Sequence, residues 1–294
     1  MGAHVDLHIH SNKSSDGEYT PSEIAALARS VGLRAIAIAD HDTVAAYPEA
    51  LEAGASEGVE IIPSMEVTTV YDEREFHLLL PFLSWESSVV TNLEKDVSRR
   101  RFKEAAERVD KLKELGFDIT WEEIVSETAP AAPLGVTIAQ VLLEKTDRPA
   151  NRKLKRYLKG EKKNFAPYHF YKDYFMEGMP ACVPRQNIPL AKVLEIAPAT
   201  GGVPVLAHPG AYFQRTTRED IAVLKDWGVR GLEVYTSYHD AEKTRFFKEA
   251  ADAFGLIATA GSDFHGAVKP HVQLGGLERG DYEMVEALRK WSPR

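Results

Sequence analysis

The hydrophobic and polar positions of this 294-residue chain fall into short segments typical of strands and helices in alternation. Four apolar segments predict strands at 3–10, 35–39, 59–66 and 76–80, and three later ones predict strands at 203–207, 231–235 and 256–260. Helical patterns lie between several of them, at 21–32, 44–56, 217–227 and 240–254. Strands separated by helices indicate βαβ units, so we expect a seven-stranded parallel α/β fold.

The pattern changes between about residues 86 and 189, where no comparable buried strand occurs. Residues 91–115 predict a charged helix ending at Gly116, and Thr120-Trp121-Glu122-Glu123 is typical of a capping box that starts another. We therefore expect one α/β domain formed by residues 1–88 and 188–294, and a helical insertion at 89–187 over the active site. Nine lysines and arginines between Lys145 and Lys163 predict either a solvated face or a surface that attracts an anionic substrate.

Composition narrows the function classes. A net charge of −8 argues against a general binder of polyanions, although metal-binding carboxylates would contribute part of that charge. The single cysteine, Cys182, excludes an internal disulfide framework and favours a reducing compartment, so we expect a cytoplasmic protein. The sequence contains no apolar run of about 20 residues, the length needed to span a bilayer. Because the predicted first strand starts at residue 3, we expect no signal peptide.

Ionisable residues gather at the ends of the predicted strands, where a parallel barrel places its chemistry. On the first strand Asp6, His8 and His10 share one face, because alternate side chains of a strand point the same way. Together with Asp16 in the following turn, the candidate ligands are His8, His10, Asp16, His41, Glu66, His77, His208, Asp263 and His265.

This donor set predicts a hydrolytic metal site. Imidazoles and carboxylates without thiolates suit Zn²⁺, Mn²⁺ or Fe²⁺, and nine donors exceed what one ion can use. We therefore expect two to three divalent ions. They would activate a bridging water and hold both the attacking and the leaving oxygen of a phosphoryl transfer. That chemistry needs no serine or cysteine nucleophile, and Cys182 is expected to be a packing residue.

Four motifs carry a family resemblance: Asp6-Leu7-His8-Ile9-His10 with Ser15-Asp16-Gly17, Asp40-His41-Asp42-Thr43, Ala207-His208-Pro209-Gly210, and Gly261-Ser262-Asp263-Phe264-His265-Gly266. With them the chain resembles, over nearly its whole length, the PHP (polymerase and histidinol phosphatase) family of metal-dependent phosphoesterases. The likeness is to the stand-alone branch, which includes 3′,5′-nucleoside bisphosphate phosphatases and 5′–3′ exoribonucleases. The resemblance implies a distorted (β/α)₇ TIM-like barrel, the PHP fold, with an inserted helical subdomain.

The resemblance also implies a trinuclear site. One ion would be held by His8, His10, Glu66 and Asp263, a second by Glu66, His77 and His208, and a third by Asp16, His41 and His265. A metal-bound hydroxide held by the first set would attack phosphorus in line. Asp6, Asp40 and Asp42 would not bind the ions. They would have structural roles or orient the ligand imidazoles by contacting the ring nitrogen that faces away from the metal.

The substrate side is marked less clearly. Arg99, Arg100 and Arg101 match an arginine-rich stretch of the relatives and suit phosphate through their planar donors, and His239 stands where relatives often carry histidine. Glu104 replaces a further arginine, and residues 135–139 lack the Arg-x-His element of the relatives. The expected substrates are small phosphomonoesters, first nucleotides (a 3′,5′-bisphosphate or AMP) and second short single-stranded RNA ends, with no membrane and no obligate protein partner.

Alternatives remain open. Histidinol-phosphate phosphatase is the other activity of the family, although Asp16 and the helical insertion argue against it. A non-enzymatic module that binds metal or nucleotide would have no reason to retain all nine candidate ligands. A metal amidohydrolase also opens with His-x-His, but it predicts a bridging lysine after a middle strand. The loop at Lys269 and His271 is expected to be solvated, with a contact at the rim of the site as the alternative, and His4 and His169 are expected to be structural.

Overall fold

The protein is represented by a computed structural model, which describes residues 4–14, 16–128 and 132–292. Ala3 of the expected first strand and Ser15 of the turn motif lie outside the described residues. Internal contacts divide the chain into two units, Met1–Glu94 with Ile188–Arg294, and Lys95–Asn187. None of the described helices combines the length and apolar character needed to span a membrane.

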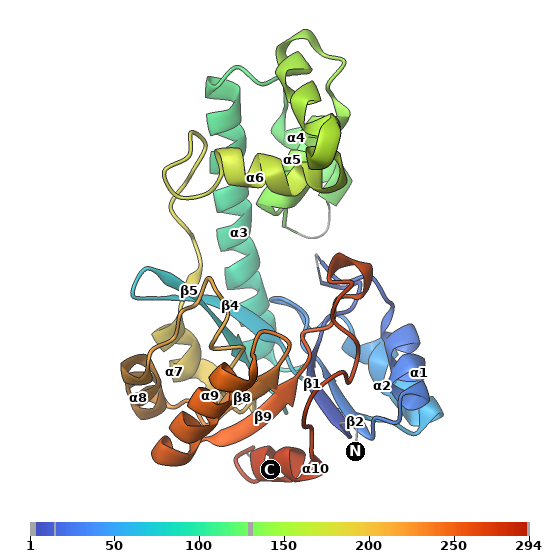
Figure 1. The fold of residues 1–294 in the computed structure, drawn as a ribbon, viewed down its shortest axis with the longest axis vertical. Coiled ribbons are helices and arrows are strands. Elements are labelled where there is room, and N and C mark those ends of the chain that lie inside the picture. The colour runs from blue at the N-terminus through green and yellow to red at the C-terminus, as the bar shows by residue number, and fades with distance from the viewer. Residues whose placement is uncertain (1–3, 15, 129–131, 293–294) are drawn as a thin grey trace. The chain divides into compact units, whose positions relative to one another are not determined.

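The first unit is a mixed α/β structure built on two sheets (Figure 1). The smaller sheet is parallel and contains β1 (Val5–Ile9), β2 (Ala35–Ile38) and β3 (Glu60–Ile61). The larger has the order β6-β4-β5-β7-β8-β9, with β4 (Glu66–Tyr71), β5 (Arg74–Leu79), β6 (Ile188–Pro189), β7 (Val205–Leu206), β8 (Gly231–Thr236) and β9 (Ile257–Gly261). Isolated bridges link Ile9 with Phe264 and His41 with Glu66, so the two sheets meet where the candidate ligands lie.

Helices follow the strands much as the hydrophobic pattern predicts. In the first unit they are α1 (Pro21–Ser30), α2 (Tyr47–Glu57), α7 (Leu190–Thr200), α8 (Arg218–Trp227), α9 (Ala241–Phe254) and α10 (Tyr282–Arg289). A capping box between Thr20 and Glu23 starts α1, because each side chain satisfies a backbone N–H of the first turn. Apolar strand residues such as Val5, Ala37 and Val205 form a core that closes against α10. This core holds the strand ends in place.

The expectation of a wholly parallel sheet is wrong at β4 and β5. These strands form an antiparallel hairpin, and β5 also pairs antiparallel with β7. The segment expected to be one strand at 59–66 is divided between β3 and β4, and β6 was not expected. Asp72 and Glu73 form the hairpin turn with φ of 49° and 60°, the left-handed conformation of a two-residue turn that follows strand twist. Neither is the Asn or Gly usual there, so the sequence offers no hairpin signal.

The second unit is helical among its described residues. The long helix α3 (Ser88–Glu114) begins in the first unit, and α4 (Trp121–Thr128), α5 (Gly135–Glu144), η1 (Pro149–Leu158), η2 (Gly160–Phe165) and α6 (Ala166–Tyr174) follow it, the two η elements being 3₁₀ helices. The expected capping box of α4 is confirmed, because the backbone N–H of Thr120 donates to Glu123 and that of Glu123 to the Thr120 hydroxyl. Buried aromatic residues such as Phe117, Tyr157 and Phe170 give the unit a core of its own.

Candidate metal centre

The nine candidate ligands converge in the first unit from the ends of six strands. They are His8 in β1 and His10 just after it, Asp16 in the next turn, His41 after β2, Glu66 at the start of β4, His77 in β5, His208 after β7, and Asp263 and His265 after β9. His41 and Asp16 are half-buried, and the other seven are buried. Strands far apart in the sequence therefore place their polar ends in one enclosed space.

The carboxylate of Glu66 lies at the middle of this group and is fully buried. Five imidazoles surround it. Its Oε2 lies 3.3 Å from His8 Nε2, 3.2 Å from His10 Nε2 and 3.0 Å from His41 Nδ1, and its Oε1 lies 2.9 Å from His77 Nδ1 and 3.0 Å from His208 Nε2. One carboxylate thus offers an oxygen to each of two groups of imidazoles.

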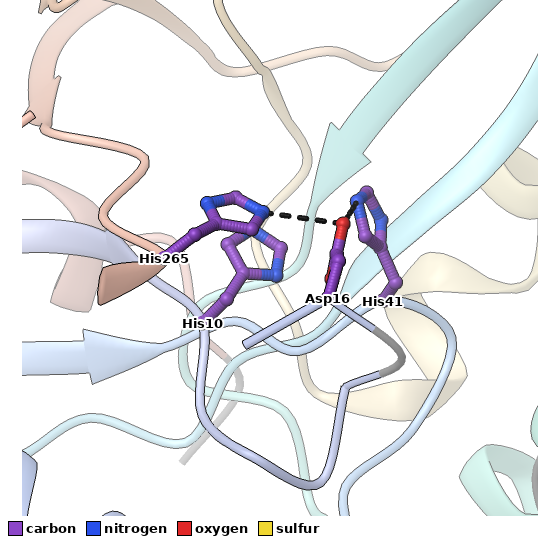
Figure 2. A group of neighbouring side chains, drawn as sticks. All are labelled: His10, Asp16, His41 and His265. Carbon is purple, nitrogen blue, oxygen red and sulfur yellow. Dashed lines mark ion pairs between the residues drawn. The ribbon is translucent and has the colours of Figure 1, made fainter. Parts of the chain in front are cut away.

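Three overlapping sets of donor atoms lie close enough to share an ion. Within each set, one donor atom from every residue lies within 4.8 Å of the others; the sets are His8, His10, Glu66 and Asp263; His10, Asp16, His41 and His265; and His41, Glu66 and His77. In the second set, Asp16 Oδ2 lies 3.3 Å from His265 Nε2 and 3.6 Å from His41 Nε2 (Figure 2). His10 and His41 each belong to two sets, which the sequence did not suggest.

The pKa values show how strongly the buried charges interact. Burial lowers the pKa of His10, but Asp263 and Glu66 outweigh it and raise that pKa to about 9. At His41 burial prevails and lowers the pKa to about 3. Burial acts to raise the pKa of Glu66, but the surrounding imidazoles hold it well below its usual range. Asp16 and Asp263 behave in the same way, so the carboxylates stay ionised and the site attracts positive charge.

The donor atoms point toward common centres more than toward one another. Glu66 Oε2 and His41 Nδ1 approach to 3.0 Å, yet among the described residues neither has a hydrogen-bond partner of proper geometry, and the same holds for His265 Nε2. A buried polar atom without a partner costs free energy unless an ion or water satisfies it. This arrangement of buried oxygen and imidazole donors fits divalent cations.

Glu233 is a site residue that the sequence analysis missed. It is fully buried in β8, its Oε1 lies 3.1 Å from His8 Nδ1, and its Oε2 accepts a hydrogen bond from the backbone N–H of His208 at 2.7 Å. It therefore orients His8 through the nitrogen that faces away from the other ligands. No side chain fits at Gly261, because a Cβ there would lie 2.2 Å from Glu233 Oε1. A lone carboxylate within an apolar strand was the available signal.

The three supporting aspartates bind backbone groups. Asp6 accepts hydrogen bonds from the N–H groups of Ser262 and Gly275, both at 2.9 Å. Asp40 accepts from the N–H and the hydroxyl of Ser11, and Asp42 from the N–H of Thr68. Asp6 and Asp40 therefore fix the loops that carry the ligands. The carboxylates beside outward imidazole nitrogens include Glu233, at His8 Nδ1, and Glu75, whose Oε1 lies 3.5 Å from His77 Nε2.

Lys269 contradicts the expectation of a solvated loop. Its Nζ contacts Asp263 Oδ2 and donates to the Tyr238 hydroxyl at 3.0 Å, while Asp263 Oδ1 stays 3.1 Å from His10 Nε2. Burial lowers the pKa of Lys269, but the Asp263 carboxylate outweighs it and raises that pKa. A permanent cation thus holds the outer oxygen of a candidate ligand and leaves the inner oxygen to the site. His271, two residues on, is exposed.

The predicted substrate contacts are placed less favourably. His239 accepts a hydrogen bond from the Gly210 N–H at 2.9 Å through Nε2, and its Nδ1 lies 2.8 Å from the Val234 carbonyl. Both of its ring nitrogens are therefore engaged by backbone, and its ring stacks on Phe247. Arg99, Arg100 and Arg101 lie on α3 in the second unit, where the first two pair with Asp96. Their contact with substrate stays a prediction.

Curated relatives match the chain over most of its length. It is 29% identical to a 5′-3′ exoribonuclease from Haemophilus influenzae, covering 90% of this chain and 91% of that protein. It is 27% identical to a 3′,5′-nucleoside bisphosphate phosphatase from Chromobacterium violaceum, covering 90% and 87%. A phosphoribosyl 1,2-cyclic phosphate 1,2-diphosphodiesterase from Eggerthella lenta is 28% identical, covering 91% and 97%.

A solved structure and a family model extend this likeness. The crystal structure of a metal-dependent phosphoesterase from Bifidobacterium adolescentis superposes with a TM-score of 0.78, covering 99% of this chain and 96% of that one at 24% identity, which supports the fold. The model of the PHP domain matches residues 6–175, more than half of the chain. The resemblance inferred from the motifs is confirmed: the chain belongs to the PHP domain family.

Proposed function

We propose that this protein is a metal-dependent phosphoesterase that hydrolyses phosphate monoesters of nucleotides. The observation that carries the proposal is the buried Glu66 carboxylate, which is shared by five imidazoles and flanked by two further ionised carboxylates. Such a donor set suits several divalent cations better than one. The protein is a hydrolase of phosphate esters, as its family membership supports.

The ligand assignment follows the family pattern. His8, His10, Glu66 and Asp263 form one of the three donor sets, whereas His208 belongs to none of them and lies 3.0 Å from Glu66 Oε1. We assign one ion to His8, His10, Glu66 and Asp263, a second to Glu66, His77 and His208, and a third to Asp16, His41 and His265. Divalent cations bound there would activate water for attack on phosphorus and neutralise charge on the phosphate oxygens. The identity of the ions is expected to be Mn²⁺, Zn²⁺ or Fe²⁺.

The side chains around the ligands keep the site rigid. Glu233 fixes the His8 ring, and Lys269 fixes Asp263. The centroid of the Phe213 ring lies 5.2 Å from that of the His77 ring and 5.6 Å from that of the His208 ring, so it limits the rotation of both imidazoles. Ligands held in this way lose little freedom when they bind an ion, which favours binding and precise positioning of a phosphate.

The substrate class is supported by the relatives. One acts on RNA ends by its name, one on nucleoside bisphosphates and one on a cyclic phosphate of ribose, so the shared element is a phosphate ester of a ribose-containing molecule. The distorted seven-stranded barrel expected from the sequence stays a prediction. The bridges Ile9–Phe264 and His41–Glu66, which join the two sheets, support it.

Phosphate release over a substrate panel tests the function. With Mn²⁺, adenosine 3′,5′-bisphosphate, AMP or a 5′-phosphorylated oligoribonucleotide should be hydrolysed faster than histidinol phosphate or phosphoribosyl 1,2-cyclic phosphate, and His10→Ala should abolish turnover. Elemental analysis should find two to three ions per chain. Preference for histidinol phosphate or the cyclic phosphate would replace the proposed substrate. No turnover with any divalent metal, together with fewer than two ions per chain, would favour a non-enzymatic binding module.

A further inference from the structure

The second unit contains a segment whose charge is opposite to that of the chain. From Lys145 to Phe175 there are ten lysines and arginines but only three acidic residues, although the whole chain has a net charge of −8. The metal ligands are all in the first unit, so this segment is not part of the metal centre. Its charge needs an explanation of its own.

The 3₁₀ helix η1 turns this sequence into a basic surface. Residues three apart eclipse one another in a 3₁₀ helix, so side chains form three rows along it. One row is buried and consists of Asn151, Leu154 and Tyr157. The other two rows are exposed and consist of Arg152, Lys155 and Leu158, and of Lys153 and Arg156, continued by Lys159. Five of these six exposed positions are cationic.

Part of the positive charge has a structural use. Arg148 and Lys145 pair with Glu123 of α4, Lys153 donates to the Leu115 carbonyl at 3.1 Å, and Arg156 donates to the Tyr157 hydroxyl at 2.8 Å. These contacts attach the segment to the rest of the second unit. They account for four of the cations.

Four other cations along the segment stay exposed. They are Arg152, Lys155, Lys159 and Lys163, and among the described residues none of them has an ion-pair or hydrogen-bond partner. Like charges held on one short segment repel one another, and no carboxylate of the described residues pairs with these four. A polyanion would offset them.

Aromatic side chains accompany the cations. Phe165 ends η2 and is 66% exposed, and Tyr168 in the first turn of α6 is 46% exposed. Helix α6 is tied to η1, because Arg156 donates to the Tyr174 hydroxyl at 3.4 Å and Tyr157 donates to Asp173 at 2.7 Å. Large exposed rings cost free energy in water, and nucleic acid bases are the ligands that stack on such rings beside cations.

We propose that η1, η2 and the first turn of α6 form a binding surface for single-stranded RNA. Arg152, Lys155, Lys159 and Lys163 contact phosphates, and the rings of Phe165 and Tyr168 stack on bases. A duplex hides its base faces, so it is a poorer ligand. The choice of RNA rests on the proposed function, since a strand bound to this unit raises the local concentration of its end for the metal centre of the same chain.

Fluorescence anisotropy measures this binding with a labelled single-stranded RNA of about 12 nucleotides. The protein is first treated with a chelator to remove metal and so prevent hydrolysis. The double variant Arg152→Glu/Lys155→Glu should bind about 20-fold more weakly at about 0.1 M salt, and its slope of log Kd against log salt should fall by about 1.4, because each lost phosphate contact removes about 0.7. Phe165→Ala should bind about tenfold more weakly with an unchanged salt slope.

Control variants separate this surface from general charge effects. Arg29→Glu/Arg245→Glu changes two exposed arginines on α1 and α9 by the same amount and should leave RNA binding within about twofold. Arg152→Lys/Lys155→Arg keeps the charge and should bind like the wild type. Equal weakening in the α1/α9 control would overturn the proposal. Heparin or duplex RNA bound as tightly as single strands, with no effect of Phe165→Ala, would also overturn it in favour of a general anion surface.

Activity assays keep this proposal distinct from the proposed function. In Arg152→Glu/Lys155→Glu, kcat/KM for AMP should stay unchanged, while KM for the oligoribonucleotide should rise by the factor seen in binding. If RNA binding shows the expected losses but no phosphate ester is hydrolysed, the proposed RNA-binding surface is supported and the proposed esterase function is wrong. If AMP is hydrolysed but RNA binding does not change in these variants, the proposed esterase function is supported and the proposed RNA-binding surface is wrong.

Discussion

The two units of this chain handle charge in opposite ways. In the first unit, the carboxylates of Glu66 and Asp263 are buried and lie at about hydrogen-bond distance from imidazole nitrogens. In the second unit, Arg152 and Lys155 on η1 and Lys159 just after it are exposed, and none of the three has a partner among the residues that the structure describes. The first arrangement is specific for small cations held at fixed points, and the second suits a long anion with many equivalent contacts.

The difference follows from the cost of burial. A charge removed from water is tolerated only with close partners, so each buried group in the first unit depends on its neighbours. Exposed lysines and arginines keep their hydration and cost little, so they can be gained or lost one at a time. Substitutions should therefore have large, interdependent effects in the first unit and small, additive ones in the second.

The largest effect is expected at Glu66. Glu66→Gln removes the charge that five imidazoles share, so kcat/KM for phosphate release should fall by at least about a thousandfold and bound metal should decrease. Glu60→Gln is the matched control, because this carboxylate of β3 contacts Tyr282 and Arg289 and no candidate ligand. Full activity in Glu66→Gln would mean that the ions lie elsewhere.

A smaller effect is expected at Glu233. This carboxylate touches the His8 ring and the His208 backbone, so Glu233→Gln should weaken metal binding by about 10–100-fold without removing a ligand. Titration of the chelated protein with Mn²⁺ measures the change. Unaltered affinity in Glu233→Gln would show that the His8 ring is held by packing alone.

The smallest effect is expected at the Glu123–Arg148 pair of the second unit. Arg148 lowers the pKa of Glu123 to about 2, below its unfolded value, so the stabilisation is present above about pH 4.5 and is lost as the pH falls toward 2. The pair is partly exposed, so a double-mutant cycle with Glu123→Gln and Arg148→Met should give a coupling below about 1 kcal/mol. Urea unfolding measures it, and a coupling above about 2 kcal/mol would contradict the contrast between the units.

The sequence predicted the elements and the candidate ligands because both leave local signals. A buried strand is a short apolar run, and His41, His208 and Asp263 each follow one within three residues. Glu233 leaves only a lone carboxylate in an apolar strand, and Lys269 only a charge in a loop, because their roles depend on which strand and loop lie beside them in the fold. The antiparallel β4–β5 hairpin was missed for a related reason: its turn uses acidic residues in a conformation that usually selects glycine or asparagine.

The path of the chain around the second unit has an evolutionary consequence. The chain leaves the first unit within α3, whose Glu94 accepts hydrogen bonds from Thr43 and Val44, and it returns at β6, which pairs with β4. Both crossing points are anchored to the first unit, and every metal-ligand candidate lies outside the excursion. The helical segment is therefore a module whose length and charge can change over evolution without altering any candidate ligand.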